Sequence, residues 1–269
     1  MPVSDRANER NVLAERLAGA VREAGTLARS FDRPLKMWTK GHDSPVTEVD
    51  IAIDRLLRAR LSDQASDIGW LSEESEDDRA RLHARRLWIV DPIDGTRAFV
   101  AGRSDWSISA ALVEDGRPVI AALAAPAEGN FFFAVAGQGA TCNGVPLAAN
   151  SGANLDGARI AGPRTHVARL RQLHPQIVVE PRVHSLALRL ARVAQGRIDA
   201  AFVSSNSRDW DLAAADLLVH EAQGALTTLT GEAPAYNRHE PVHQPLVAAG
   251  RPRHRALLAL VHERQTEFR

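Results

Sequence analysis

The sequence contains a single cysteine, Cys142, and no surplus of either charge. One cysteine cannot form an intrachain disulfide, and a cage of thiolate ligands around a metal ion is excluded as well. Lysine plus arginine and aspartate plus glutamate number 33 each, so no net field draws the protein to a nucleic acid polymer or an anionic membrane. We expect a metal site, if there is one, to be made of oxygen ligands.

Long apolar runs are also lacking. Residues 1–10 are polar and do not contain the hydrophobic core of a signal peptide. No run approaches the roughly 20 apolar residues that a membrane-spanning helix needs. These absences predict a cytoplasmic protein with no membrane partner.

The 269 residues are enough for one large domain or two smaller ones with a substantial buried core. Strand-like segments at 107–113, 119–126 and 131–135, separated by short turns that contain glycine, indicate an antiparallel meander. Further along the chain, strands and helices alternate, which is typical of α/β organisation. We predict two units, an α+β half at 1–150 and an α/β half at 151–269.

Hydrophobic periodicity and capping residues predict further elements. The expected helices are 13–31, 47–61, 185–196, 209–223 and 253–263. The expected strands are 68–71, 87–90, 177–179, 198–203 and 246–249. The strand at 177–179 is apolar enough to be interpreted as buried.

Two carboxylates follow the strand 87–90, in the stretch Asp91-Pro92-Ile93-Asp94-Gly95-Thr96. Proline lacks a backbone donor, so we expect strand pairing to stop at Pro92 and the chain to turn. Glycine permits a positive φ, and Asp94 or Thr96 can cap a following helix. Two acids at the end of a strand, beside a helix N-terminus, suit a phosphate together with its cations.

Other acidic residues stand at the ends of predicted elements. Asp50 lies three residues after Thr47, the spacing of a capping box, which by itself accounts for Asp50. Glu73 and its acidic neighbour follow the strand 68–71, where adjacent acids are usually a solvated loop. Asp211 falls in the first turn of a helix, where the helix dipole favours an acid. A structural role and a chemical role are both open at each position.

Four motifs resemble, in the same order along the chain, those of the inositol monophosphatase superfamily of magnesium-dependent, lithium-sensitive phosphatases. Residues 91–96 (D-P-I-D-G-T) resemble its central motif, and residues 47–50 resemble its T-x-x-D element. Residues 72–75 resemble its G-E-E-S element, with Ser72 in place of the usual glycine, and residues 210–214 resemble its W-D-x-A-A element.

The resemblance implies a layered αβαβα sandwich of the inositol monophosphatase and fructose-1,6-bisphosphatase type. It also implies a hydrolase that uses two or three Mg²⁺ ions to split a small phosphorylated metabolite with an activated water, and a homodimer, which is common among similar proteins. The implied metal ligands are Glu73, Asp91, the Ile93 carbonyl, Asp94 and Asp211. The implied catalytic residues are Glu73 and Thr96, which orient the water, and Asp50, which holds the Thr96 hydroxyl. The candidate substrate contacts are Asp94, Gly95, Thr96, Ser185 and Arg208.

The substrate is a separate question, because similar proteins include 3'(2'),5'-bisphosphate nucleotidases and some histidinol-phosphate phosphatases. Arg97 follows D-G-T, where those two groups more often have a basic residue than inositol phosphatases do. Ser204 stands about where inositol-type enzymes place a glutamate that binds a substrate hydroxyl. We predict a 3'(2'),5'-bisphosphate nucleotidase that converts 3'-phosphoadenosine 5'-phosphate to AMP. The alternatives are an inositol monophosphatase, a histidinol-phosphate phosphatase and a regulatory module that binds metal and phosphate without turnover.

Overall fold

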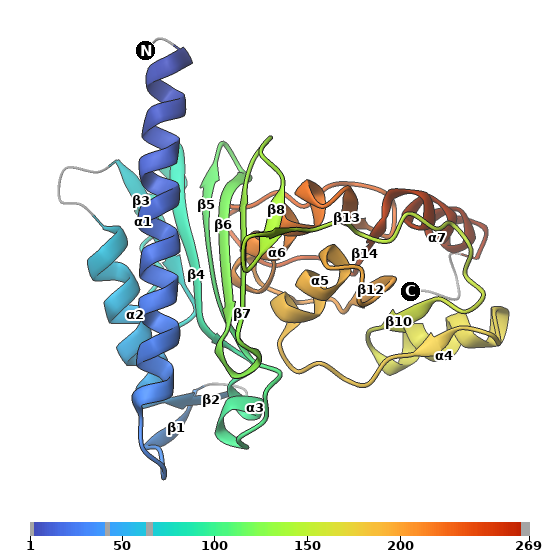
Figure 1. Cartoon of the computed structure of the whole chain (residues 1–269), viewed down its shortest axis with the longest axis horizontal. Coiled ribbons are helices and arrows are strands. Elements are labelled where there is room, and N and C mark those ends of the chain that lie inside the picture. The colour runs from blue at the N-terminus through green and yellow to red at the C-terminus, as the bar shows by residue number, and fades with distance from the viewer. Residues whose placement is uncertain (1–2, 41–43, 63–66, 265–269) are drawn as a thin grey trace.

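The chain folds into five layers, in the order helices, sheet, helices, sheet, helices (Figure 1). The structure is a computed structural model that describes residues 3–40, 44–62 and 67–264. The layered αβαβα sandwich expected from the motifs is therefore confirmed.

The first sheet has seven strands in the order β3-β4-β5-β6-β7-β8-β9. They are β3 (Ile68–Ser72), β4 (Arg86–Asp94), β5 (Ser107–Glu114), β6 (Arg117–Ala125), β7 (Asn130–Val135), β8 (Ala140–Cys142) and β9 (Val145–Pro146). β3 and β4 are parallel, and every later neighbour is antiparallel, which confirms the predicted meander. Short 3₁₀ helices lie at Arg79–His83 and Pro126–Glu128.

Helices α1 (Val3–Ser30) and α2 (Glu48–Leu61) cover the outer face of this sheet. Along α1, Leu17, Val21 and Ala24 are buried at helical spacing, which gives the apolar stripe that packs on the strands. The start of α2 is a capping box in which Thr47 and Asp50 bond each other's backbone amides. Both helices were predicted from the sequence.

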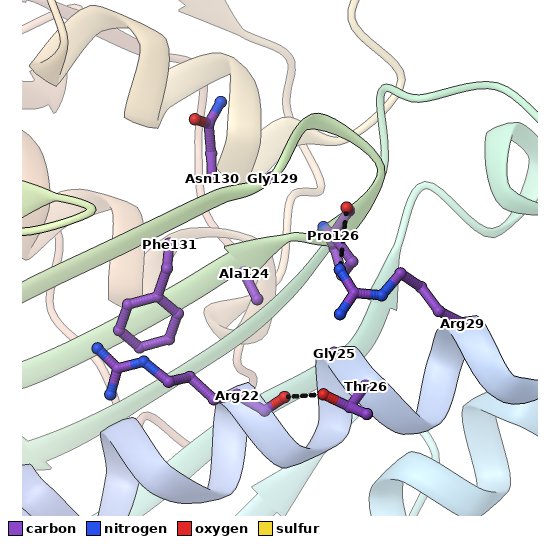
Figure 2. A pocket seen from close by; sticks show the side chains of 9 residues that line it. All are labelled: Arg22, Gly25, Thr26, Arg29, Ala124, Pro126, Gly129, Asn130 and Phe131. Carbon is purple, nitrogen blue, oxygen red and sulfur yellow. Dashed lines mark hydrogen bonds between the residues drawn. The ribbon is translucent and has the colours of Figure 1, made fainter.

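Helix α1 and the β6–β7 turn also line a pocket (Figure 2). The Arg22 guanidinium lies 4.0 Å from the centroid of the Phe131 ring, and Arg29 Nη1 donates to the Pro126 carbonyl at 3.4 Å. Both contacts join α1 to the sheet. The pocket lies on the sheet face opposite α6, and no predicted site residue lines it.

The middle layer consists of α5 (Leu186–Ala194) and α6 (Asp209–Glu221). Helix α6 contacts strands of both sheets. Its apolar residues are consequently buried on most sides of the helix rather than along one stripe. Three consecutive alanines, Ala213 to Ala215, are among them and allow close approach of the neighbouring layers.

The second sheet has the strand order β11-β10-β12-β14-β13. Its strands are β10 (Arg159–Ala161), β11 (Val178–Val179), β12 (Ala200–Val203), β13 (Gly224–Thr228) and β14 (Leu246–Gly250). The outer helices are α4 (Arg164–Leu173) and α7 (Arg251–Glu263), and their apolar residues share a core with this sheet. The strands of the first sheet all precede residue 150 and those of the second all follow it, but α5 and α6 share one core with both sheets. The division into halves at residue 150 stays a prediction.

A hairpin of β1 (Met37–Lys40) and β2 (Ser44–Thr47) lies beside α3 (Thr96–Val100), at the end of the sheet where β4 finishes (Figure 1). The sequence analysis did not predict this hairpin. It also did not predict β10, α4 or β13.

Three local predictions were wrong. β4 does not stop at Pro92 but pairs with β5 as far as Asp94, because the register shifts by one residue between Asp91 and Asp94. Helix α3 is preceded by Gly95 at φ 90°, and no side chain caps it, so neither Asp94 nor Thr96 has the capping role we expected. The strand at 177–179 is present as β11, but its two residues are exposed because β11 is the edge strand of the second sheet.

Among the described residues, no helix is long and apolar enough to cross a membrane. The polar segment 1–10, predicted to lack a signal-peptide core, begins with two residues outside the described part, and residues 3–10 belong to α1.

Asp209 fixes the start of α6 and is fully buried. Its carboxylate accepts from His243 Nε2 at 2.7 Å and from the Asn237 amide at 2.9 Å. Asp209→Ala should lower the free energy of unfolding by about 2 kcal/mol, because both donors lose their acceptor. Urea unfolding measures this, with Asp156→Ala as the exposed control, for which we expect a change within about 0.5 kcal/mol. Equal stabilities of the two variants would contradict the assignment.

Candidate active site

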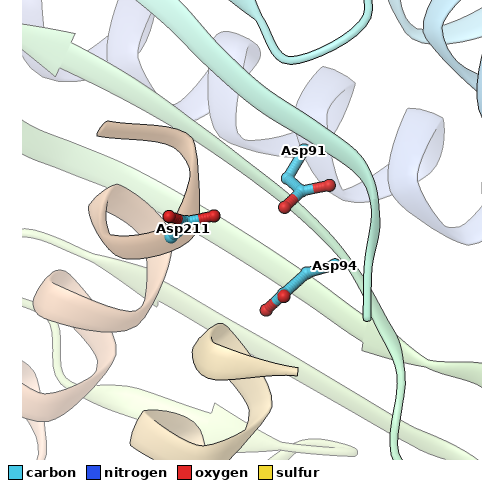
Figure 3. Close-up of side chains that lie close together, drawn as sticks. All are labelled: Asp91, Asp94 and Asp211. Atoms are coloured by element: carbon cyan, nitrogen blue, oxygen red, sulfur yellow. The ribbon is translucent and has the colours of Figure 1, made fainter. Parts of the chain in front are cut away.

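Three carboxylates from two distant segments meet between the first sheet and the middle helices. Asp91 and Asp94 project from β4 toward Asp211 at the start of α6 (Figure 3). One carboxylate oxygen of each residue lies within 4.8 Å of the other two. Asp91 is 1% exposed and Asp94 is 7% exposed, whereas Asp211 is partly exposed, so the cluster opens to solvent on the side of α6.

A β-bulge at Pro92 places the two acids of β4 on the same face. In a regular strand, residues three positions apart point to opposite faces. Here Asp91 pairs with Ser109 and Asp94 pairs with Ser107, so three steps on β4 match two steps on β5. Since Ser107 and Ser109 share a face, the acids opposite them share it too. The bulge also accommodates the missing amide donor of proline.

Helix α5 holds Asp94 in place. Asp94 Oδ2 accepts a hydrogen bond from Ser185 Oγ at 2.7 Å and from the Ala187 amide at 2.6 Å. Ser185 is fully buried and is the N-cap of α5, where its hydroxyl also accepts from the Leu188 amide at 2.9 Å. The Ser185 hydroxyl, expected from the sequence to contact substrate, therefore lies against Asp94 and orients it.

The turn at Gly95 passes close to the same helix. A Cβ at Gly95 would lie 3.1 Å from the Ser185 amide nitrogen, and φ at Gly95 is 90°. Glycine is required on both counts. The turn leads into α3, whose first amides have no acceptor within the helix.

Asp50 and Thr96 meet across the start of α2. Thr96 Oγ1 lies 3.3 Å from Asp50 Oδ1 and 3.0 Å from the Ile93 carbonyl oxygen. Asp50 Oδ2 accepts from the Thr47 amide at 2.9 Å and from the Thr47 hydroxyl at 2.5 Å. The capping interpretation of Asp50 and its contact with Thr96 are thus both found.

Glu73 follows β3, and its amide donates to the Val90 carbonyl at 3.2 Å. Lys40 Nζ donates to the Glu73 carbonyl at 2.9 Å and forms an ion pair with Glu74. The Glu73 side chain is not one of the three clustered acids, but it interacts electrostatically with Asp211 and Asp94.

Asp54 on α2 fixes this loop and was not singled out in the sequence. Its carboxylate accepts from Ser72 Oγ at 2.5 Å and from Ser75 Oγ at 2.7 Å. Ser72, which departs from the glycine of the family motif, therefore has a defined partner. The only sequence signal is the position of Asp54 one helical turn after Asp50, on the same side of α2.

Burial and mutual repulsion perturb every acid at the site. Burial, followed by Asp211 and Glu74, raises the pKa of Glu73 to about 8. Burial, followed by Asp94, raises the pKa of Asp211 to about 7. The pKa of Asp91 lies well above its ordinary value because of burial and its acidic neighbours. Burial also raises the pKa of Asp94, although the bonds from α5 oppose the change.

These donors fit a hard divalent cation. The available groups are carboxylates and a backbone carbonyl, the oxygen ligands that Mg²⁺ prefers. Within the described part of the chain, the buried Asp91 Oδ1 has no hydrogen-bond partner, and a cation is the partner that suits a buried carboxylate oxygen among other acids.

Arg208 and Arg189 bring positive charge near the acids. The amide of Arg208 donates to Asp211 Oδ2 at 2.7 Å, while its exposed side chain lies over Trp210. Arg189, on α5, interacts electrostatically with Asp94, and its buried Nε lacks a hydrogen-bond partner among the described residues. The sequence analysis missed Arg189 because its spacing after Ser185 is that of an ordinary helix surface.

The fold and the acid cluster define a phosphatase of the layered αβαβα class that depends on metal ions. Residues 9–266 match the model of the inositol monophosphatase family, and the chain belongs to that family. It is therefore a phosphoric monoester hydrolase that acts on a phosphorylated small molecule. Dependence on metal, with magnesium, and sensitivity to lithium are characteristic of the family.

Two relatives carry different substrate names. A Rhizobium meliloti protein named inositol-1-monophosphatase is 34% identical over 234 residues, which cover 82% of this chain and 87% of that protein. A Mycobacterium leprae protein named 3'-phosphoadenosine 5'-phosphate phosphatase is 34% identical over 226 residues, which cover 78% and 77%.

Solved structures share the fold. The extragenic suppressor protein suhB from Bartonella henselae gives a TM-score of 0.81 at 27% identity, covering 92% of this chain and 97% of that one. An IMPase/NADP phosphatase complexed with Mg²⁺ and phosphate gives a TM-score of 0.81 at 23% identity, covering 94% and 96%.

The raised pKa values predict an unusual pH dependence of stability in the metal-free protein. Each acid binds its proton more tightly in the folded chain, so its contribution is complete below about pH 4 and is lost as pH rises through the folded pKa. Those pKa values are about 7 for Asp211 and about 8 for Glu73. Stability in EDTA should therefore fall between about pH 5 and about pH 8, and excess Mg²⁺ should reduce the fall because cations replace the protons.

Urea unfolding at several pH values, in EDTA and in Mg²⁺, measures this effect. Asp216 serves as an internal reference, because its pKa is also raised, to about 7, by burial away from the cluster. Asp216 contributes equally to the pH dependence in EDTA and in Mg²⁺. The difference between the two pH profiles therefore comes from the acids of the site. Identical pH profiles with and without Mg²⁺ would contradict the prediction.

Proposed function

We propose that this chain is a Mg²⁺-dependent phosphomonoesterase that removes the 3'-phosphate of a 3'(2'),5'-bisphosphate nucleotide and converts 3'-phosphoadenosine 5'-phosphate to AMP. The observation that carries the choice of substrate is the partly buried guanidinium of Arg189, whose Nε is buried without a hydrogen-bond partner among the described residues, on the helix that bonds Asp94. The Mycobacterium leprae relative with that activity in its name supports the same choice.

The acids divide into two sets of metal ligands in this proposal. Glu73, Asp91 and the Ile93 carbonyl would hold one Mg²⁺, and Asp91, Asp94 and Asp211 would hold a second. When bound, the cations neutralise phosphate oxygens, stabilise the leaving oxygen and acidify a water. Two ions, or three as the resemblance allows, satisfy the buried acids whose pKa values are raised.

The remaining groups orient the reactants. Asp50 accepts from Thr96, so a lone pair of the Thr96 oxygen is free to accept a hydrogen bond from the attacking water and to orient it. Glu73 would be the second acceptor for this water. The amides of Gly95 and Thr96, at the start of α3, suit a phosphate oxygen.

Arg189 matches a second anionic group on the substrate. Burial lowers the pKa of its guanidinium. The charge of Arg182 lowers this pKa further, whereas the charge of Asp94 raises it. The Nε of Arg189 is buried without a hydrogen-bond partner among the described residues, and an unsatisfied buried donor is unfavourable in the free protein. A 5'-phosphate would supply that partner while the 3'-phosphate occupies the cations. The exposed Arg208 side chain stays a second candidate for this contact.

Inositol monophosphate is the second candidate, because the Rhizobium meliloti relative carries that substrate in its name. Ser204 argues against it. This residue is exposed at the end of β12 and offers a hydroxyl where a carboxylate would bind a substrate hydroxyl more strongly.

Asp94→Asn should reduce Mg²⁺-dependent phosphate release by about 100-fold or more, because a ligand charge is lost at the cluster. The amide oxygen can still accept from Ser185 and Ala187, so the fold should persist. Asp216→Asn is the matched control, a partly buried acid on α6 that accepts from Tyr236 Oη at 2.9 Å outside the cluster. Undiminished activity of Asp94→Asn, or an equal loss in both variants, would refute the assignment.

The substrate is tested by comparing kcat/KM for 3'-phosphoadenosine 5'-phosphate, inositol 1-phosphate and histidinol phosphate. We expect the nucleotide to be preferred. Arg189→Met should raise KM for the nucleotide by about tenfold or more, since a charge-assisted hydrogen bond contributes about 1.5–3 kcal/mol, and should leave inositol 1-phosphate nearly unchanged. Arg192→Met, on the same helix but paired with Glu128, is the control. A large preference for either other substrate would overturn the proposal.

A further inference from the structure

The β1–β2 hairpin carries an exposed indole beside the site. Trp38 is 46% exposed, and the other four tryptophans of the chain are buried or partly buried. No hydrogen bond or ring contact joins the indole of Trp38 to other described side chains. An indole combines a large apolar face with a polar N–H, so one that is exposed beside a polar site is a candidate for ligand contact.

Both ends of the hairpin are attached to the acids. At the end of β1, Lys40 Nζ donates to the Glu73 carbonyl at 2.9 Å. At the end of β2, the Thr47 amide donates to Asp50 Oδ2 at 2.9 Å, and Asp50 in turn accepts from Thr96. The position of the hairpin relative to the site is therefore fixed by polar contacts and not only by chain connectivity.

Strand geometry places the indole on the side of the hairpin that faces the site. Trp38 and Lys40 are two positions apart on β1, so they share a face, with Cα atoms about 7 Å apart. Trp38 lies opposite Val46 in the hairpin, and directly opposed residues also share a face. Val46 and, on the other face, Thr47 are both fully buried, so burial along β2 does not distinguish the two faces. The bond from Lys40 to the Glu73 carbonyl does, because it places the face shared by Trp38 and Lys40 next to the loop that carries Glu73. The indole itself is 46% exposed.

We infer that Trp38 is a stacking platform for the nucleobase of the substrate, on the same side of the hairpin as Lys40 and next to the acid cluster. This inference rests on the proposed nucleotide substrate and names the group that recognises the base. A purine presents a planar π face, and an exposed indole gains both stacking and apolar contact from covering it. A polyol phosphate has no such face and gains little there.

Kinetics of Trp38→Ala and Trp38→Phe test the inference, with Met37→Ala as the control. Met37 is the adjacent exposed apolar residue, 54% exposed, on the opposite face of β1. Trp38→Ala should raise KM for 3'-phosphoadenosine 5'-phosphate by about tenfold with little change in kcat. Trp38→Phe should recover most of the affinity. Hydrolysis of glycerol 2-phosphate, which has no base, should be the same in all variants.

Fluorescence gives a second readout. Adenosine 5'-phosphate, titrated in the presence of Ca²⁺, should quench tryptophan emission in the wild type and in Met37→Ala but not in Trp38→Phe. Equal KM values for wild type and Trp38→Ala, or an equal loss on the nucleotide and on glycerol 2-phosphate, would overturn the inference while the proposed function stands. A wild-type enzyme that does not hydrolyse the nucleotide would overturn both.

Discussion

Repulsion between carboxylates is the constraint on which this site depends. Asp91, Asp94 and Asp211 approach one another within 4.8 Å, in surroundings that raise the pKa of all three. Two like charges about 4 Å apart repel by about 4 kcal/mol at an effective dielectric constant of about 20. The cluster therefore needs protons or cations. A site built from acids binds an anionic phosphate only through the positive charge that the cations bring.

Helix starts hold three of the acids, so capping and the site use the same contacts. Asp50 accepts a backbone amide at the start of α2, Asp94 at α5 and Asp211 at α6. In each case the bond goes to Oδ2 and leaves Oδ1 for another partner. The capping role and the chemical role that the sequence left open for Asp50 and Asp211 are compatible for this reason.

Local patterns predicted most of the fold, and the family resemblance of the motifs predicted the clustered acids. Helical spacing and glycine turns gave α1, α2, α6, α7 and the meander, because these patterns act within one segment. The bulge between Asp91 and Asp94 could not be predicted from the residues of β4 alone, because it depends on how β4 pairs with β5. The sequence shows that Pro92 lacks an amide donor. Only the register of β4 against β5 shows that strand pairing continues past Pro92. The short strands β1, β2 and β10 carry too few residues for a periodic signal.

The parts of the site that the sequence did not reveal act through tertiary contacts. Asp54 and Arg189 look like ordinary polar positions on helices, and their importance appears only when the loop after β3 and the start of α5 meet the acids. The hydroxyl of Ser185 bonds Asp94, and the predicted contact of Ser185 with substrate stays a prediction. A motif identifies which residues gather at a site, whereas the hydrogen bonds determine which oxygen atoms are left for a ligand. The residue roles and the homodimer stay predictions.

The second sheet acts on the site without supplying any of its predicted residues. Those residues come from the first sheet, from loops and from the starts of α2, α3, α5 and α6. Helix α6 packs between the two sheets, and its first turn contains Asp211. Rotation of α6 would expose alanine and leucine side chains to polar surroundings or press them into a strand. The direction of the Asp211 carboxylate is therefore set by apolar packing on both faces of α6, and this packing keeps a third acid next to two others against their repulsion.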